Sequence, residues 1–228
     1  MEQQTAVLSL VDYKSSAVPW GVSRLVMGKY PFSNIPGLQF VKVLGCGKHG
    51  GFDLYPSFKK QGLFCVFKSQ QLAEEFLKNS LIIKNYQVHA SEYFSVMLQA
   101  YSSKGSWSKN EMQITQATPL EGAIAGITRA SIKFSKAPSF WSKAPPAQDS
   151  LEQAKGCLLA AGLGEAPYLR QATFTMWESP SAMDQYARSG AHLEAIQTAY
   201  QGQFFSESMF TRFIPIQPQG IWRGKHYG

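Results

Sequence analysis

The chain has 228 residues, 44% of them hydrophobic, with a formal net charge of +7 and a pI near 9.3. This length and apolar content suit one large or two small globular domains with a true core. No run of about 18 apolar residues occurs, and MEQQTAVLSL at the N-terminus lacks the pattern of a signal peptide, so we expect a cytoplasmic protein. The basic residues are scattered and no RNA-binding motif is present, which argues against nucleic acid as a partner.

Three cysteines lie far apart in the sequence, at Cys46, Cys65 and Cys157, and no CxxC pair is present. This spacing favours neither a zinc site nor a framework of disulfides. We therefore expect buried thiols.

Taken in chain order, strand and helix patterns alternate along the whole sequence. Alternating apolar residues that are β-branched or aromatic predict the strands, and apolar spacings of three and four predict the helices. In the first part, strands are expected at about 5–14, 38–46, 62–68 and 92–101, with helices near 18–30 and 69–85. In the second part, strands are expected at about 124–135, 156–164, 168–177 and 207–217, with helices near 139–155 and 180–203.

The two parts are a weak internal repeat, a feature that bears on the fold before any motif does. The segments Glu92–Trp107 and Glu207–Trp222 both start with glutamate, continue as a strand pattern and end in Gly-x-Trp. Upstream, Phe64–Ser80 matches Phe174–Gly190 as a strand, a serine and a helix. Earlier still, AVLSLVDYK parallels GITRASIKF.

Each part therefore has the order strand, helix, strand, strand, helix, strand, which is the ferredoxin-like arrangement. Such a half leaves one face of its sheet open, and two halves can close face to face into a barrel. We predict an α+β fold of tandem ferredoxin-like repeats forming a pseudo-dimer of the dimeric α/β barrel type. The predicted divisions are an N-terminal half at 1–103, a connector at 104–123 and a C-terminal half at 124–228.

Several motifs together resemble the spheroidene monooxygenase family of bacterial carotenoid oxygenases. They are KVLGCGKHGGFDLYP (42–56), KGSWS (104–108), GITRASIKF (126–134), GEAPYLRQATFTMW (164–177), ARSGAHLEAIQ (187–197) and FFSESMFTRF (204–213). The resemblance implies a dimeric α/β barrel, a haem cofactor, dioxygen chemistry, and a ferredoxin or reductase as electron donor. It implies hydroxylation of an acyclic carotenoid and then oxidation to a ketone. Uptake of a carotenoid from lipid implies peripheral membrane contact, and a homo-oligomer is left open.

His192 is the candidate iron ligand within this resemblance. A straight helix from Ser181 would turn His192 about 180° away from Met183, toward water, since each residue advances about 100°. Gly190, after Ser189, is a poor helix interior and marks a plausible break. A helix restarted there carries one face of small and apolar residues next to the histidine, formed by Ala195, Ile196 and Ala199. That face leaves room for a planar macrocycle beside an imidazole ligand.

The repeat supplies an internal comparison for this site. Aligning 78–87 with 188–197 places Ile82 opposite His192, so we expect one metal site, in the C-terminal half. Other haem proteins of this superfamily likewise carry the proximal histidine on the second helix of a repeat, with the sheet as the distal wall. The alternative is an exposed histidine at a helix restart.

Further candidates lie on the neighbouring strands. Arg212 and Arg129 are assigned to an iron-bound oxygen species or a haem propionate, with structural ion pairing as the alternative for each. Trp177 is a candidate for contact with the porphyrin face, or is a core residue. Gln171 and Thr173 share one sheet face and line either a pocket or the barrel interior.

The other histidines are weaker ligand candidates: His49 lies in a glycine-rich turn, His89 before a strand and His226 in the terminal tail. Two other classes of function stay open beside the haem-dependent carotenoid monooxygenase. One is another small-molecule oxygenase or haem enzyme on the same barrel. The other is a protein that binds haem or an isoprenoid without turnover. Product analysis under reducing, aerobic conditions discriminates among the three.

Overall fold

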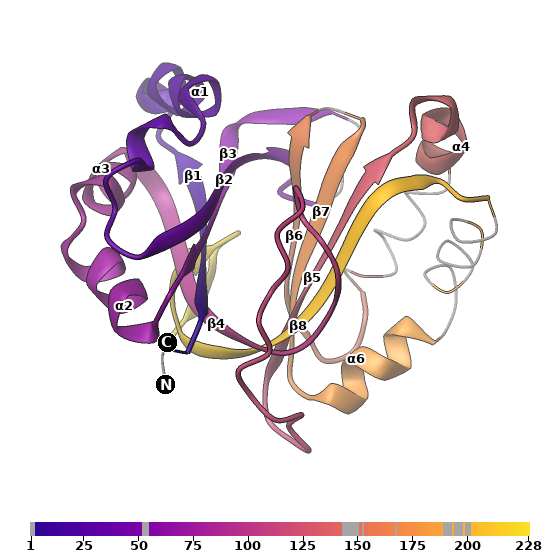
Figure 1. The fold of residues 1–228 in the computed structure, drawn as a ribbon. Coiled ribbons are helices and arrows are strands. Elements are labelled where there is room, and N and C mark those ends of the chain that lie inside the picture. Colours follow the sequence, from indigo (N-terminus) through magenta and orange to yellow (C-terminus); the bar gives the residue numbers. More distant parts are fainter. Residues whose placement is uncertain are drawn as a thin grey trace.

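A closed antiparallel barrel forms the centre of the molecule, with the helices outside it (Figure 1). The structure is a computed structural model, and it describes residues 3–51, 55–142, 151, 153–166, 168–188, 193, 198 and 202–228. Within these residues, the N-terminal elements are β1 (Thr5–Tyr13), α1 (Val18–Met27), β2 (Leu38–Gly47), β3 (Pro56–Phe67), α2 (Gln70–Asn79), α3 (Leu81–His89) and β4 (Ala90–Gly105). The C-terminal elements are β5 (Ile124–Ile132), α4 (Ala137–Trp141), β6 (Cys157–Ala166), β7 (Arg170–Trp177), α6 (Pro180–Ala187), β8 (Phe205–Trp222) and β9 (Lys225–Tyr227).

The strand order has the ferredoxin-like pattern twice. The first four strands run β4-β1-β3-β2 and the next four run β6-β7-β5-β8, all antiparallel to their neighbours. Two seams close the barrel, a long one between β4 and β8 and a short one between β2 and β6. The expected α+β barrel is therefore confirmed, while the division of the chain at 104–123 stays a prediction.

Three of the expected helices differ from the sequence pattern. For the helix expected at 139–155, the structure describes α4 at Ala137–Trp141, and most of the residues that follow lie outside the described ranges. The helix expected at 69–85 is two helices, α2 and α3, because Ser80 ends the first and caps the second, accepting a hydrogen bond from the Ile82 amide at 3.1 Å. The helix expected at 180–203 begins as α6 and ends at Ala187. Most of the residues that follow lie outside the described ranges.

Both faces of the barrel wall are buried at strand β1 in the N-terminal half. Alternate residues of β1 show this, since Leu8 and Leu10 point into the barrel and Val7 and Val11 point outward under the helices of the N-terminal half. The interior core draws on strands of both halves, and a smaller outer cluster around Trp177 lies under α6. The interior core thus holds the two halves together.

The repeated Gly-x-Trp ends have a structural cause. Gly105 and Gly220 have φ values of 82° and 101°, in the left-handed region that favours glycine. A Cβ at Gly105 would overlap with the carbonyl oxygen of Ser208, and one at Gly220 with that of Tyr93. Each glycine lets the end of one long strand approach the start of the other.

The repeated glutamates hold the turns that follow the tryptophans. Glu207 accepts hydrogen bonds from the Lys109 amide at 2.9 Å and the Ser106 hydroxyl at 3.0 Å. Glu92 accepts in the same way from the amides of Arg223, at 2.7 Å, and Gly224, at 3.0 Å. Because β4 and β8 are antiparallel, each glutamate lies beside the turn of the other repeat.

Two of the three cysteines are buried, as the sequence predicts, and the third is half-buried. Cys46 and Cys65 are buried, Cys157 is half-buried, and none forms a disulfide. Burial raises the pKa of the Cys46 and Cys65 thiols well above the usual range, so both stay protonated.

Candidate functional site

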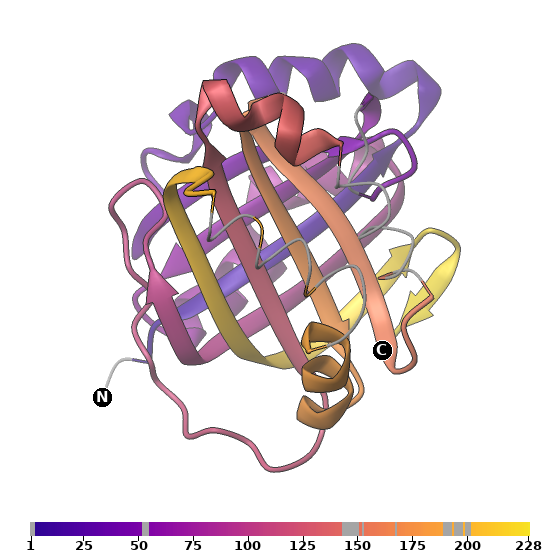
Figure 2. The ribbon, with the colours of Figure 1, turned by 90° about the vertical axis from the view of Figure 1, so that its right-hand side faces the viewer.

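The outer face of the C-terminal sheet lies between α4 and α6 in the view of Figure 2. Small and hydroxyl side chains occupy this face. The ladder between β5 and β7 pairs Gly126 with Thr175 and Thr128 with Thr173. Side chains two residues apart on a strand share a face, so these four form one patch. Thr128 is exposed and Thr173 half-buried, whereas Gly126 and Thr175 are buried, the first beneath Met183 of α6.

The N-terminal half provides the comparison, because its strands pair in the same register. There Val7 pairs with Cys65 and Ser9 with Leu63, at the positions of the Gly126–Thr175 and Thr128–Thr173 pairs. Val7, Cys65 and Leu63 belong to an apolar cluster that fills the space under the helices. At two of these positions the C-terminal sheet carries the smaller side chain, Gly126 for Val7 and Thr173 for Leu63, and the face is more polar than its N-terminal counterpart.

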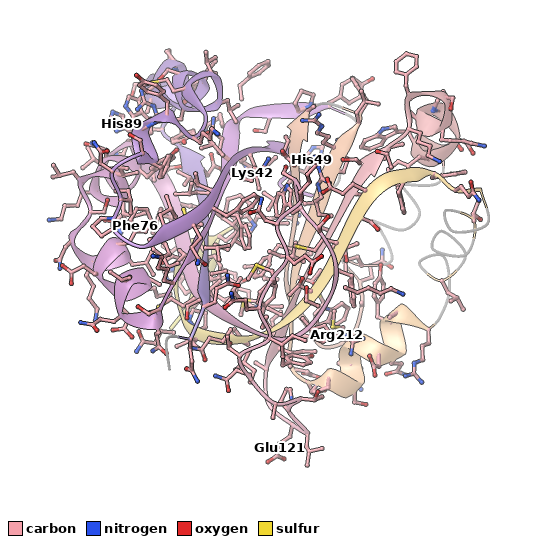
Figure 3. All side chains as sticks on the ribbon, in the orientation of Figure 1. Lys42, His49, Phe76, His89, Glu121 and Arg212 are labelled. Atoms are coloured by element: carbon pink, nitrogen blue, oxygen red, sulfur yellow. The ribbon has the colours of Figure 1, made fainter. Side chains whose placement is uncertain are left out.

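Arg212 is the only cation of this patch among the described residues, and its repeat counterpart is apolar. It lies opposite Gly126 in the β5–β8 ladder, as Met97 lies opposite Val7 in the β1–β4 ladder. Met97 is 2% exposed in the apolar cluster of its half, whereas the Arg212 side chain is 24% exposed. Its guanidinium donates to Asp184 of α6 at 2.7 Å and lies close to that helix in Figure 3.

Trp177 lies on the same outer face, at one edge of the patch. The indole is buried, with its ring centroid 5.2 Å from that of Tyr186 on α6. Its Nε1–H has no hydrogen-bond partner within the described residues. A buried N–H without an acceptor is costly, so a bound group that offers one would be stabilised here.

Gln171 and Thr173 also point outward. Their neighbours Ala172 and Phe174 belong to the interior core, and successive side chains of a strand alternate between faces. The interpretation that Gln171 and Thr173 line the barrel interior is therefore wrong. Thr173 belongs to the outer patch, and Gln171 lies further along the same strand face, near Gly164.

Arg129 lies on the opposite face of the sheet from Arg212. It is 2% exposed inside the barrel mouth and pairs with Glu207 at 2.5 Å and Glu165 at 3.2 Å. Lys42 and the Trp107 indole also donate to Glu165, each at 2.6 Å. Arg129 thus takes part in structural ion pairs, and the structure does not bring it to the patch that holds Arg212.

The carboxylates of this ion-pair network are strongly bound. Burial by itself raises the pKa of Glu207, but hydrogen bonds from the Lys109 amide, Ser106 and Arg129 outweigh it and lower that pKa to about 2. Burial likewise opposes ionisation of Glu165, and hydrogen bonds from Lys42 and Trp107 lower its pKa. Both carboxylates are therefore ionised at neutral pH.

His192, Ala195 and Ala199 lie outside the described residues. Of the segment 189–201, only Leu193 and Thr198 are described, and both are helical. In the N-terminal half, the aligned residue Ile82 packs against the apolar cluster between helix and sheet.

The remaining histidines lie away from the patch. His89 stacks on Trp20, with ring centroids 4.2 Å apart, and its Nδ1 contacts the Asn85 carbonyl at 2.8 Å. His49, labelled in Figure 3, lies in the loop between β2 and β3. His226 lies in β9.

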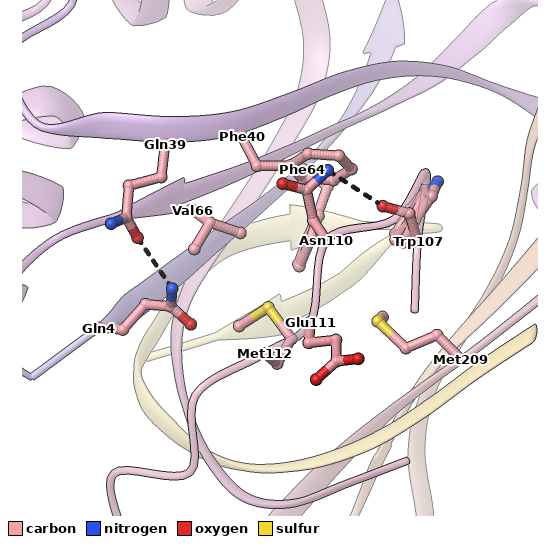
Figure 4. A pocket seen from close by; sticks show the side chains of 10 residues that line it. All are labelled: Gln4, Gln39, Phe40, Phe64, Val66, Trp107, Asn110, Glu111, Met112 and Met209. Carbon is pink, nitrogen blue, oxygen red and sulfur yellow. Dashed lines mark hydrogen bonds between the residues drawn. The ribbon is translucent and has the colours of Figure 1, made fainter. Parts of the chain in front are cut away.

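The barrel mouth contains a pocket of about 170 Å³ that the sequence patterns did not reveal (Figure 4). Its lining combines interior aromatic residues with a part of the connector. The lining residues are Gln4, Gln39, Phe40, Phe64, Val66, Trp107, Asn110, Glu111, Met112 and Met209. The sequence placed the connector between two halves and held no signal that it covers the barrel mouth.

Comparison with curated proteins identifies the family. The chain is 47% identical to the spheroidene monooxygenase of Rubrivivax gelatinosus over 222 residues, covering 97% of this chain and 86% of the relative. The chain belongs to the spheroidene monooxygenase family. It is 30% identical to the spheroidene monooxygenase of Rhodobacter capsulatus over 226 residues, covering 96% and 93% of the two chains. No family model matches the sequence. As a member of this family the chain is an enzyme, a monooxygenase.

Solved structures support the fold of this family member. An aldoxime dehydratase in complex with butyraldoxime superposes with a TM-score of 0.60 at 12% identity, covering 94% of this chain and 80% of that chain. A second aldoxime dehydratase gives a TM-score of 0.57 at 14% identity, covering 93% and 82%. At these identities the likeness concerns the barrel alone.

Proposed function

We propose that the protein is a haem-dependent monooxygenase that hydroxylates an acyclic carotenoid and then oxidises the product to a ketone. Its relatives are named for spheroidene, an acyclic carotenoid, and this supports the substrate class. The observation that carries the proposal is a difference between the two halves. The outer face of the C-terminal sheet carries Arg212 where the N-terminal sheet carries the apolar Met97.

The proposed reaction balances as follows. A substrate C–H bond breaks, one oxygen atom of dioxygen forms the C–OH group, and the other leaves as water. Two electrons and two protons from outside complete each turnover. A second turnover at the same carbon gives a geminal diol, which loses water to form the ketone. Haem iron supplies the activation of dioxygen when bound, and the protein supplies orientation and a dry site.

The residues of the C-terminal half have distinct proposed roles. His192 holds the iron through a neutral imidazole nitrogen, and Ala195 and Ala199 leave space beside it. Arg212 pairs with a carboxylate of the cofactor or with charge that develops on oxygen, because a guanidinium in a partly buried site favours anions.

The neighbouring strand β7 completes the proposed site. Trp177 packs against the edge of the cofactor and donates its indole N–H to it. Thr173, with Gln171 beyond it, lines the side of the pocket where the carotenoid lies. Water is excluded on the Trp177 side, where that residue and Met183 are buried.

Substrate and electrons are proposed to arrive from outside the fold. A carotenoid dissolves in lipid, and among the described residues no helix is long and apolar enough to cross a bilayer. Peripheral contact is consistent with the net charge of +7, since anionic lipid attracts basic surfaces. A ferredoxin or a reductase is the proposed electron donor.

The test of the cofactor assignment is titration of the purified protein with haem, followed by its absorption spectrum. We expect one Soret-active site per chain, lost or converted to a weak-ligand spectrum by His192→Ala. His49→Ala, His89→Ala and His226→Ala serve as controls and should keep the spectrum. Equal haem binding by His192→Ala would disprove the ligand assignment, and absence of haem binding by the parent protein would remove the haem proposal.

The test of the reaction is product analysis. The haem-loaded protein, spheroidene in detergent, dioxygen and a reduced ferredoxin system should yield hydroxylated and then keto products. Oxygen from labelled dioxygen should appear in the product. A bound carotenoid that stays unoxidised under these conditions would favour a binding protein instead.

A further inference from the structure

The pocket at the barrel mouth has an apolar floor and a polar rim. Phe64, Val66, Trp107 and Met209 are buried, and the Trp107 ring stacks on that of Phe64 with centroids 5.2 Å apart. The rim consists of the exposed residues Gln39, Asn110 and Glu111. Such a combination of apolar lining and a few polar groups is typical of a site for a small molecule.

The opposite end of the barrel, near Trp222, is the repeat counterpart of this pocket, and there side chains fill the space. Phe94 follows Glu92 in β4 at the position that Met209 has after Glu207 in β8, and Tyr227 follows Trp222 as Met112 follows Trp107. At that end Phe94 and Tyr227 pack edge to face, with centroids 5.0 Å apart. The Tyr227 hydroxyl donates to the Leu158 carbonyl at 3.0 Å, and β9 pairs with β8.

At the Trp107 end, methionines take the place of both rings. Figure 4 shows Met112 and Met209 below Phe64 and Val66 in the lining of the pocket. The connector there forms an isolated bridge between Trp107 and Asn110 and, as far as the structure describes it, no strand like β9. Methionine is unbranched and adapts its shape to a ligand, whereas an aromatic ring does not. The exchange therefore opens one end of a barrel whose other end is filled.

The chemistry of the lining limits the ligand. The rim amides are partly engaged, since the Gln39 carbonyl oxygen accepts from Gln4 at 2.8 Å and the Asn110 amide nitrogen donates to the Ser108 carbonyl at 2.9 Å. The Glu111 carboxylate at the entrance disfavours an anion. An apolar cavity of about 150 Å³ in another protein binds benzene, so this pocket of about 170 Å³ accepts a group of five or six carbons.

We infer that this pocket binds the neutral, branched end of an isoprenoid: one five-carbon unit that carries an oxygen toward the rim. The ligand is either the end of a carotenoid chain, which rests on the proposed function, or a free small isoprenoid alcohol. The site is separate from the outer patch, because Met209 points into the barrel and Arg212 points away from it.

The experiment uses the whole protein labelled with ¹³C at the methionine methyl groups and titrated with 3-methylbut-2-en-1-ol. Of the seven methionines, Met112 and Met209 should show saturable shifts, while the exposed Met27 should not. No saturable shift at either residue, or equal shifts at all methionines, overturns the inference.

Two variants that fill the pocket sharpen the test. Met209→Phe places the counterpart of Phe94 in the pocket and should weaken binding of the alcohol at least tenfold. Met112→Phe fills the same space from the half-buried connector and tests the inference without change to a strand. The matched control, Phe94→Met, makes the reverse change at the filled end and should leave the Met209 shift intact. Unchanged binding in both filled variants overturns the inference.

Competition identifies the source of the ligand. Spheroidene in detergent should displace the alcohol if the pocket takes the end of the carotenoid chain. Retention of the alcohol at saturating spheroidene assigns the pocket to a free small isoprenoid. Neither measurement needs haem or turnover, so failure here is distinct from failure of the proposed oxygenase.

Discussion

At the scale of single residues, Arg212 and Met97 show that the outer sheet faces of the two halves differ in chemistry. They occupy the same position in the two halves, yet one is a cation and the other a buried thioether. A partly buried guanidinium costs solvation that the pair with Asp184 offsets only in part. A residue that opposes stability at a position where its repeat is apolar indicates a functional requirement.

The first prediction concerns Arg212→Met, which copies the N-terminal half. Loss of the cation should lower haem affinity at least tenfold, or about 1.4 kcal/mol. The melting temperature of the haem-free protein should stay equal or rise, because the exchange adds apolar burial. Haem titration and thermal unfolding measure the two effects, and Arg212→Lys is the control that keeps the charge. Unchanged affinity in Arg212→Met would remove Arg212 from the proposed site.

The second prediction concerns Glu207 and acid. Its folded-state pKa of about 2 lies below the ordinary value of 4.5, so the ionised form stabilises the fold. This stabilisation is complete above about pH 4.5 and is lost as the pH falls toward 2. Glu207→Gln should therefore flatten the free energy of unfolding against pH in this range. Urea unfolding followed by circular dichroism measures it, and an unaltered slope would assign acid sensitivity to other carboxylates.

At the scale of elements, the long strands β4 and β8 depend on their repeated glycines. Gly105 and Gly220 combine a left-handed backbone with a close approach to the partner strand. Backbone strain and close approach can be separated, because Gly122 in the connector has a φ of 86° but no neighbour that an added methyl group would touch.

The third prediction follows from this difference. Gly122→Ala should cost only the strain of the left-handed backbone, about 1–3 kcal/mol. Gly105→Ala and Gly220→Ala should cost a further 1–3 kcal/mol or so, because the added methyl group overlaps with a carbonyl of the partner strand. Chemical unfolding of the three variants provides the comparison. Equal costs would mean that the strands separate to accommodate the methyl group.

At the scale of the whole molecule, the two seams that close the barrel are unequal. The β4–β8 seam extends from Phe94 to Gly105, whereas β2 and β6 pair only at Gly45 and Cys46. The ion pair between Lys42 and Glu165, at 2.6 Å, also joins β2 to β6. The short seam is therefore the weaker closure of the barrel.

The fourth prediction is that the barrel opens first at the short seam. Amide hydrogens of β2 and β6 at this seam should exchange at least tenfold faster than those of β4, a difference of about 1.4 kcal/mol in opening free energy. Glu165→Gln should increase exchange at the short seam and leave β4 unchanged. Native-state hydrogen exchange measures both, and equal rates at both seams would show that the barrel opens only as a whole.

The sequence by itself determined most of the strands and their repetition. The strand expected at 38–46 is β2 at Leu38–Gly47, and the one expected at 168–177 is β7 at Arg170–Trp177. Alternation and turn residues are local signals, and they act over a few neighbouring positions. The repeated glutamate, glycine and tryptophan likewise indicated a doubled fold before any contact was known.

Only the tertiary structure decided which face each side chain occupies. Alternation groups Gln171 with Thr173 but does not say whether the two side chains point into the barrel or away from it. The ladder registers also make Val7, not Ala6, the repeat counterpart of Gly126, since Val7 lies opposite Cys65 and Gly126 opposite Thr175. A shift of one residue reverses the face of every side chain in a strand. For this reason the separation of Arg129 from Arg212, the small-residue patch and the pocket at the barrel mouth followed from strand pairing between distant segments, which no local pattern in the sequence encodes.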